Sequence, residues 1–215
     1  MEQRFISSNA QPQQGAYHTK WQAPSNIALV KYWGKTPPQL PKNASLSFTL
    51  SHAQTQTEVR FTPLSARSIK VSFSILFEGE EKPSFRPKIE AFFDHIIAYQ
   101  PFLLHYDVAI SSHNTFPHSS GIASSASSMA ALAACLVDFE SQLTPMDEKL
   151  KLEKISFLAR LGSGSACRSV QGPMMAWGKH PSVVASSDLT AVTVEDIHPI
   201  FTSYCDTILL VDKGQ

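Results

Sequence analysis

Residues 116–128 read FPHSSGIASSASS, a stretch made largely of small and hydroxyl-bearing residues. Strand-like residues precede it at 106–110, and apolar side chains then recur with helical spacing at Ile122, Ala126 and Met129. The predicted order is therefore strand, small-residue loop, helix. Small residues let backbone N–H groups approach a ligand, and a helix start offers unpaired donors, so the pattern favours a phosphate ligand. A serine-rich helix start that only caps itself is an equally open interpretation at this point.

Two further stretches combine small residues, hydroxyls and cations: residues 31–35 (KYWGK) and residues 163–168 (SGSACR). The planar guanidinium of Arg168 suits two-point contact with a carboxylate or a phosphate, whereas Lys31 and Lys35 act as point charges on phosphate oxygens. Together with the first loop, these stretches predict a site for two anionic substrates.

Each of these residues also has a purely structural interpretation. Lys31 and Lys35 on their own would be solvated charges at the end of a strand. Tyr32 and Trp33 could be core aromatics, which is the interpretation we favour for Trp33. His118 lies within the first loop, where a general base is one interpretation and a solvent-facing loop residue is the preferred one.

The elements that must position these stretches are predicted to be mixed strands and helices. An apolar strand covers residues 21–30, and a loop with three prolines covers residues 36–42. Residues 79–87, with two prolines and charges of both signs, predict an exposed mobile loop. Further strands are predicted at 45–50, 57–61, 68–77, 170–179, 191–195 and 207–211.

Two more helices are predicted besides the one that follows the first loop. Residues 87–99 place Ile89, Phe92 and Ile96 on one stripe, and we assign this helix to packing of the core and to no other role. The other helix is predicted to be capped by Thr144 and to run to about residue 161.

Composition narrows the class of protein. The chain has 215 residues, a formal net charge of zero and 43% hydrophobic residues, which is typical of a globular protein without general attraction for nucleic acid. No stretch approaches the ~20 apolar residues of a membrane span. The three cysteines are widely separated and form no metal-binding pair, so we expect reduced thiols and a cytoplasmic location. Neither a GxxxxGK[ST] nor a GxGxxG motif is present.

Three motifs together resemble a known family. Residues 117–126 (PHSSGIASSA) resemble the phosphate loop of the GHMP kinase superfamily. Residues 23–35 (APSNIALVKYWGK) and 162–169 (GSGSACRS) are similar to motifs of the diphosphomevalonate decarboxylase family, as are residues 43–47 and 114–117. The resemblance covers about residues 21–180. It implies an α+β fold of the GHMP kinase type.

The resemblance implies an activity, cofactors and site residues. The reaction would be ATP-dependent decarboxylation of mevalonate 5-diphosphate to isopentenyl diphosphate, with magnesium bridging the ATP phosphates. Lys35 and Arg168 would be catalytic. The substrate-binding residues carried over by motif are Ala28, Lys31, Tyr32, Lys35, Ser163, Ser165 and Arg168. The nucleotide-binding residues are Pro117, Gly121, Ser124, Ser125 and Ala126, and Ser125 is also the expected magnesium ligand.

The sequence departs from the family pattern at its end. The family uses an aspartate in its second half to orient or deprotonate the 3-hydroxyl, and Asp212 does not stand at that motif position. We therefore expect the N-terminal portion of an enzyme: a polar, poorly ordered lead-in over 1–20, a GHMP domain over 21–195, and the start of a second domain over 196–215.

Alternatives stay open at this stage. One is a related kinase or decarboxylase that acts on the 3-hydroxyl of mevalonate or phosphomevalonate, because small changes in a pocket separate these substrates. Another is a non-catalytic ligand-binding module. No nucleic acid or membrane partner is expected, and a homodimer is an open alternative.

Overall fold

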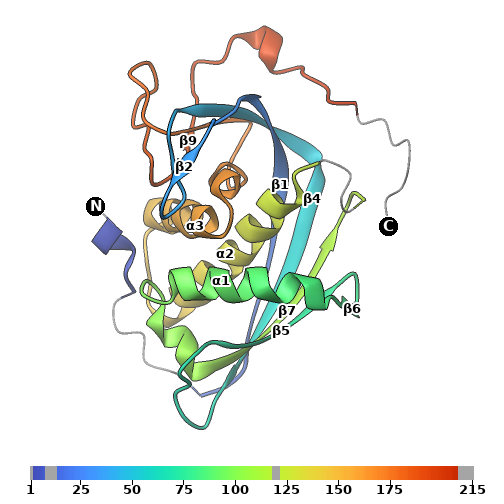
Figure 1. Ribbon diagram of the computed structural model, residues 1–215, viewed down its shortest axis with the longest axis vertical. Coiled ribbons are helices and arrows are strands. Elements are labelled where there is room, and N and C mark those ends of the chain that lie inside the picture. The colour runs from blue at the N-terminus through green and yellow to red at the C-terminus, as the bar shows by residue number, and fades with distance from the viewer. Residues whose placement is uncertain (1, 8–13, 118–121, 208–215) are drawn as a thin grey trace.

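The computed structural model describes residues 2–7, 14–117 and 122–207 (Figure 1). Its strands are β1 (Tyr17–Val30), β2 (Lys35–Thr36), β3 (Leu40–Pro41), β4 (Ser45–Pro63), β5 (Ser72–Phe77), β6 (Glu80–Glu81), β7 (Tyr106–Asn114), β8 (Met174–Trp177) and β9 (Val192–Thr193). Its α-helices are α1 (Arg86–Ile96), α2 (Ser124–Leu143) and α3 (Glu148–Gly162). Short 3-10 turns are η1 (Glu2–Phe5), η2 (Pro83–Phe85), η3 (Pro101–His105), η4 (Gly164–Arg168) and η5 (Pro199–Phe201).

Strand β4 is the centre of a seven-stranded mixed sheet with the order β6-β5-β7-β4-β8-β9, and β1 also pairs with β4. On one side β4 pairs with β1 along nearly its whole length, and on the other it pairs first with β8 and then with β7. We expected two strands over this region, and that prediction was wrong. The polar residues 54–57 continue the strand because β1 and β7 both supply ladder partners there.

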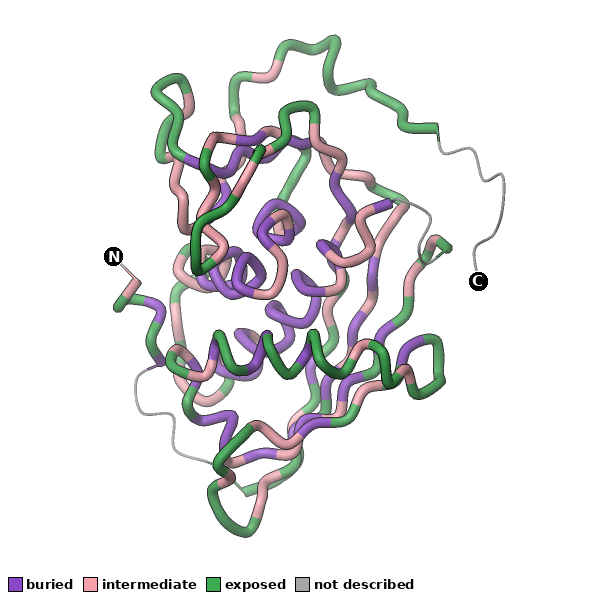
Figure 2. Tube along the Cα trace, in the orientation of Figure 1, coloured by how far each residue is buried: buried purple, intermediate pink, exposed green. Residues whose placement is uncertain are grey.

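The helices cover one face of this sheet (Figure 1). Helix α2 is apolar on almost every side because it lies between the sheet and the other helices, and it is buried along most of its length (Figure 2). Helix α1 buries Ile89, Phe92, Phe93 and Ile96 and exposes its other side, as its periodicity predicted. The mixture of strands and helices confirms the α+β fold class.

The start of α3 differs from the prediction. Asp147, not Thr144, is the N-cap, and its carboxylate accepts from the backbone N–H of Leu150 at 2.9 Å. Thr144 instead ends α2, where its N–H donates to the carbonyl of Glu140. The two helices thus follow one another with only a short connection, which brings the end of α3 back toward the start of α2.

The first twenty residues are not a lead-in outside the fold, as far as they are described. Phe5 is fully buried and stacks on Phe157 of α3 with ring centroids 4.4 Å apart, and β1 already begins at Tyr17. The Ser7 hydroxyl donates to the carbonyl of Tyr99 at 2.9 Å. The described residues before position 20 are therefore ordered against the domain, through a buried aromatic side chain, a hydrogen bond and the start of β1.

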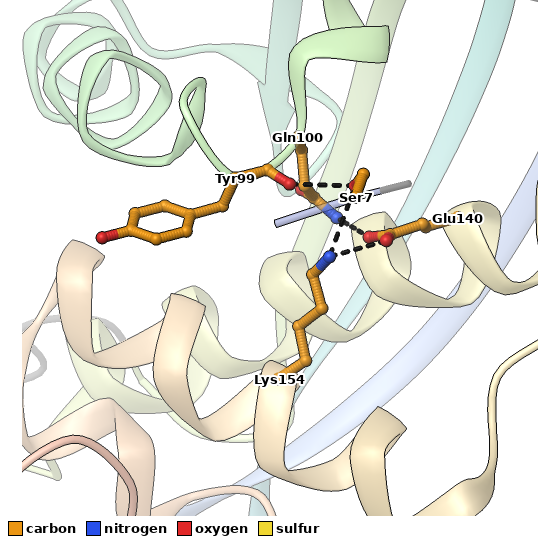
Figure 3. Close-up of polar contacts among 5 residues, drawn as sticks. All are labelled: Ser7, Tyr99, Gln100, Glu140 and Lys154. Atoms are coloured by element: carbon orange, nitrogen blue, oxygen red, sulfur yellow. Dashed lines mark hydrogen bonds and ion pairs between the residues drawn. The ribbon is translucent and has the colours of Figure 1, made fainter. Parts of the chain in front are cut away.

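A buried polar cluster fixes the same segment to the helices (Figure 3). Lys154 of α3 and Glu140 of α2 form an ion pair of 2.6 Å, with their side chains 3% and 5% exposed. Gln100 Nε2 donates to the other Glu140 oxygen at 2.8 Å, and Lys154 Nζ lies 3.3 Å from Ser7 Oγ. Ion pair and hydrogen bonds together join the segment after η1 to α2 and α3.

Several smaller expectations are corrected. Residues 79–87 are not simply a loop, because β6, η2 and the start of α1 lie there. The proline-rich residues 36–42 form the β2–β3 pair and its turn. Trp33 is 83% exposed and not a core residue. Of the strand predicted at 207–211, only Thr207 is described, and it is not in a strand. The division into domains stays a prediction.

Candidate active site

The serine-rich loop and the second glycine-serine stretch meet at the adjacent ends of α2 and α3. Ser125, in the first turn of α2, has its hydroxyl 3.4 Å from that of Ser163, which follows α3. Gly162 permits this approach, since a Cβ there would lie 2.7 Å from the Met129 sulfur and 2.9 Å from a Phe92 ring carbon. Two stretches far apart in the sequence therefore present hydroxyls to one place.

Lys88 adds a cation to these hydroxyls. Its Nζ donates to Ser125 Oγ at 2.6 Å, which joins the first turn of α1 to the first turn of α2. The residue as a whole is exposed, yet loss of hydration at its ammonium, and next the positive charge of Lys35, lower the pKa of Lys88. Two positive charges close to each other and to hydroxyl groups favour the binding of an anion.

Lys35 stands at the start of the β2–β3 pair and faces the same region. Its ammonium lies 5.8 Å from the centre of the Tyr32 ring, and it donates to Gln39 Oε1. Tyr32 in turn meets Trp177 edge-on, with ring centroids 4.9 Å apart. A Cβ on Gly164 would lie 3.2 Å from Cδ of Lys35, so the aliphatic stem of this lysine rests close to the chain of η4.

Arg168 lies behind this surface and is buried, with 2% exposure. Its Nη1 donates to the Ser45 hydroxyl and its Nη2 to Asn26 Oδ1 at 3.4 Å, and its Cζ lies 5.8 Å from the centre of the Tyr32 ring. Burial lowers the pKa of Arg168. Its Nε is buried and has no hydrogen-bond partner within the described part of the chain, so one donor is left for a ligand.

None of the ion pairs among the described residues includes Lys35, Lys88 or Arg168. Buried or clustered cations are normally balanced by carboxylates. Among the described residues, the three cations contact two hydroxyls, two amide oxygens and the Tyr32 ring in place of a carboxylate, which favours the binding of an anion.

A pocket of about 110 Å³ adjoins Lys88 and Ser125. Its lining combines apolar side chains with serines, which are Ile75, Phe77, Phe85, Ile89 and Met129, and Ser112, Ser124, Ser125 and Ser128. A flat apolar group joined to an anionic chain would match this combination. A larger groove of about 630 Å³ between α3 and β8–β9 contains no predicted site residue and lacks this cluster of cations.

Of the predicted site residues, Tyr32 lies beside Lys35 and Arg168, and Ser125 lies beside Ser163. Lys88, which contacts Ser125 and is affected by the charge of Lys35, connects the two groups. Of the other predicted residues, Lys31 and Pro117 are exposed, and Ala28 is half-buried opposite Ser47 on β4. The carbonyl of Ser165 accepts from the Asn26 amide at 3.4 Å. Ser124 is the first residue of α2, and Ala126 is buried within it. Gly121 and His118 lie outside the described residues.

Two residues of the site were missed at the sequence level. Lys88 was passed over because the helix that carries it was assigned only to the core, and nothing in the sequence brings that helix beside Ser125. Asn26 stands in the first motif but was given no role, although its amide donates to Ser169 Oγ at 2.7 Å and its oxygen accepts from Arg168. A polar residue within an otherwise apolar strand is the signal that could have drawn attention to Asn26.

The donors fit a polyphosphate better than they fit a metal ion. Residues 2–7, 14–117 and 122–207 contain no group of three His, Cys, Asp or Glu side chains that could hold a metal. Ser125, the expected magnesium ligand, accepts a hydrogen bond from the Lys88 ammonium, and this positive charge disfavours a second cation at the same hydroxyl.

No helix within residues 2–7, 14–117 and 122–207 is both long and apolar enough to cross a bilayer.

A mixed sheet with helices on one face (Figure 1), and a helix α2 whose first turn meets Lys88, is the arrangement of the GHMP kinase class. Residues 23–189 match the family described as the diphosphomevalonate decarboxylase-like N-terminal domain. The chain belongs to this family.

Individual relatives agree with this assignment. Diphosphomevalonate decarboxylase of Ganoderma lucidum is 35% identical over 86% of this chain and 48% of its own length. The crystal structure of mevalonate diphosphate decarboxylase from Staphylococcus aureus is similar with a TM-score of 0.68 at 34% identity, over 86% of this chain and 52% of that one. MDDEF in complex with MVAPP, AMPPCP and magnesium has a TM-score of 0.66 at 32% identity, over 84% and 51%. The chain spans about half the length of these relatives.

Proposed function

We propose that this chain is the N-terminal portion of a diphosphomevalonate decarboxylase and that it binds mevalonate 5-diphosphate and the phosphates of ATP. The observation that carries the proposal is the contact of Lys88 with Ser125 beside Lys35 and Ser163, without a carboxylate among the described residues to balance the lysines. The solved complex of a relative with MVAPP, AMPPCP and magnesium supports the same pair of ligands.

The proposed reaction transfers the terminal phosphoryl group of ATP to the 3-hydroxyl of the substrate. That phosphate then leaves together with carbon dioxide, and the electrons of the broken C–C bond form the double bond of isopentenyl diphosphate. Phosphoryl transfer depends chiefly on positioning and on neutralising charge, which are the tasks that cations and hydroxyls perform.

Each residue of the cluster takes one of these tasks. Lys88 and Ser125 hold phosphate oxygens of the nucleotide at the start of α2, where the helix dipole is also favourable. Lys35 and Tyr32 hold the substrate diphosphate, and Ser163 orients it. Arg168, whose Nε has no partner among the described residues, is assigned to the substrate carboxylate.

The remaining assignments belong to the same proposal. Magnesium would be held mainly by phosphate oxygens, with Ser125 joining only after Lys88 has moved to a phosphate. Ala28, Lys31 and Ser165 would line the substrate side, and the apolar pocket beside Lys88 would receive the nucleobase. A cytoplasmic location accords with these small charged substrates, and light scattering would decide between a monomer and a homodimer.

Calorimetry with mevalonate 5-diphosphate, and separately with AMPPCP and magnesium, tests the proposal. Binding of both ligands is the expected result, and binding of neither overturns it. Incubation with ATP then separates the activities. ADP formed together with carbon dioxide indicates a decarboxylase, ADP without carbon dioxide indicates a 3-kinase, and binding without ADP indicates a non-catalytic portion.

A further inference from the structure

Arg160 is a fully buried arginine in the last turn of α3. Its Nε donates to the carbonyl of Leu189 at 2.9 Å, and its Nη1 donates to the carbonyl of Pro38. Its guanidinium also lies 5.1 Å from the centre of the Phe157 ring. The side chain thus connects the end of α3 to two loops that are distant from it in the sequence.

Burial of the Arg160 guanidinium would be unfavourable if its only role were to stabilise the fold. The hydrogen-bond acceptors of Arg160 are carbonyl oxygens, and its Nη2 has no partner within the described residues. The carboxylates of Glu2 and Asp188 favour its charge, but none of the ion pairs among the described residues includes it. Burial of a charge without a carboxylate partner is unfavourable, and a nonpolar side chain of similar volume would often be tolerated better. A guanidinium at this place is therefore better explained by what it holds.

Both carbonyls belong to loops that support the candidate site. Pro38 lies in the turn between β2 and β3, and the next residue, Gln39, accepts from the Lys35 ammonium. Leu189 follows Asp188, whose carbonyl accepts from Trp177 Nε1 at 2.9 Å. Trp177 is the residue that packs edge-on against Tyr32. One hydrogen bond of Arg160 thus ends one residue before Gln39, the acceptor of Lys35. The other ends one residue after Asp188, the acceptor of Trp177.

We propose that Arg160 is a positioning residue that sets the place of the Lys35 ammonium by anchoring the turn between β2 and β3 to the end of α3. This inference rests on the proposed function, because Lys35 is assigned there to the substrate diphosphate. Lysine cannot replace arginine in this role, because one ammonium lacks the planar fork that reaches two carbonyls at once.

Hydrogen exchange of the ligand-free chain tests the anchoring directly. In Arg160→Lys and Arg160→Met, amide exchange in residues 34–42 should become faster by about tenfold or more, because a charge-assisted hydrogen bond is lost from a short strand pair. Exchange in α1 and β7 should stay as in the unchanged protein. Arg60→Met, at an exposed arginine of β4, is the matched control and should leave residues 34–42 unaffected. Unchanged exchange in residues 34–42 in both Arg160 variants would overturn the inference.

A double-mutant cycle tests the route through Lys35. Arg160→Lys should weaken binding of mevalonate 5-diphosphate by about tenfold in the otherwise unchanged chain. The same substitution should have almost no further effect in a Lys35→Met background. Equal losses in both backgrounds would show that Arg160 acts through the fold at large and would refute the inference. If the unchanged chain does not bind the diphosphate, the proposed function fails, while hydrogen exchange still decides whether Arg160 anchors the turn.

Discussion

Lys88 and Ser125 are 37 positions apart in the sequence, yet the lysine ammonium lies 2.6 Å from the serine hydroxyl. This contact joins the first turns of α1 and α2. It places a cation at the helix end where a phosphate would be bound, and the nearby Lys35 makes that place still more positive. The helix that was expected only to pack the core therefore also supplies a candidate binding residue.

Replacement of Lys88 by methionine should weaken binding of AMPPCP by about tenfold, because one charge-assisted hydrogen bond to a phosphate is lost. Binding of mevalonate 5-diphosphate should change much less. Calorimetry measures both affinities. The control is Lys82→Met, at a lysine whose partner is Glu80 on the β6 edge, and it should alter neither affinity. Equal losses of AMPPCP affinity in the two variants would contradict the role of Lys88.

The same lysine predicts a pH dependence. Its pKa in the free chain is lowered by loss of hydration and by the charge of Lys35, and only its protonated form attracts phosphate. Affinity for AMPPCP should therefore fall as the pH rises through this lowered pKa, at a lower pH than for an ordinary lysine. Binding should also take up protons there, because a bound phosphate raises the pKa of Lys88 again.

Calorimetry of AMPPCP binding from about pH 7 to about pH 10, in buffers of different ionisation enthalpy, measures this effect. The informative variant is Lys88→Arg, since the guanidinium of an arginine stays protonated throughout this range. This variant should retain affinity at high pH and abolish the proton uptake. A proton uptake that persists in Lys88→Arg would assign the titration to another group.

Arg168 predicts a separable effect on the other ligand. Alanine at this position would leave a cavity and remove the partner of Ser45 and Asn26, so lysine is the more informative replacement. Arg168→Lys should weaken binding of mevalonate 5-diphosphate by about tenfold or more, on the order of one charge-assisted hydrogen bond, with AMPPCP affinity retained. Calorimetry with both ligands and a thermal unfolding curve make the comparison. Unchanged affinity for the diphosphate would count decisively against Arg168 as a substrate residue.

The local order of elements could be predicted from the sequence, whereas the positions of charged side chains could not. Periodicity indicated α1, α2 and the strand before the serine-rich loop, because apolar spacing follows directly from the geometry of helices and strands. Residue types and the resemblance to a family assigned Ser125 to the nucleotide side and Ser163 and Arg168 to the substrate side of one predicted site. Lys88 was missed because its neighbour is set by how α1 lies against the start of α2, a tertiary relationship that leaves no periodic signal.

The burial of individual side chains was also difficult to predict from the sequence. Trp33 is apolar and lies beside a strand, and an isolated hydrophobic side chain gives no sign of whether it faces solvent. Phe5 shows the reverse case, since it is a buried aromatic in a polar segment. Lys154 and Glu140 are nearly fully buried although their residue types are usually exposed, because each has its partner in another helix.

The Lys154–Glu140 pair leads to a prediction about stability. Lys154→Met would leave the Glu140 carboxylate buried with only the Gln100 amide as a partner, and should lower the free energy of unfolding by about 3–5 kcal/mol. Adding Glu140→Leu should recover most of this loss, because the pair is then replaced by nonpolar groups. Urea unfolding of the single and double variants measures both changes.

The exposed pair of Lys82 and Glu80 supplies the control for that experiment, since Lys82→Met should change the free energy of unfolding by no more than about 1 kcal/mol. Comparison of Lys154→Met with Lys82→Met separates the cost of leaving a buried carboxylate unpaired from the cost of losing an ion-pair contact. In one contrary outcome, Lys154→Met is destabilising and Glu140→Leu adds to the loss of free energy instead of reversing it. The Glu140 carboxylate is then needed for its hydrogen bond to Gln100, and the ion pair in the cluster of Figure 3 is secondary. If Lys154→Met costs no more than Lys82→Met, the pair is open to water in solution and η1 is held chiefly by Phe5 against Phe157.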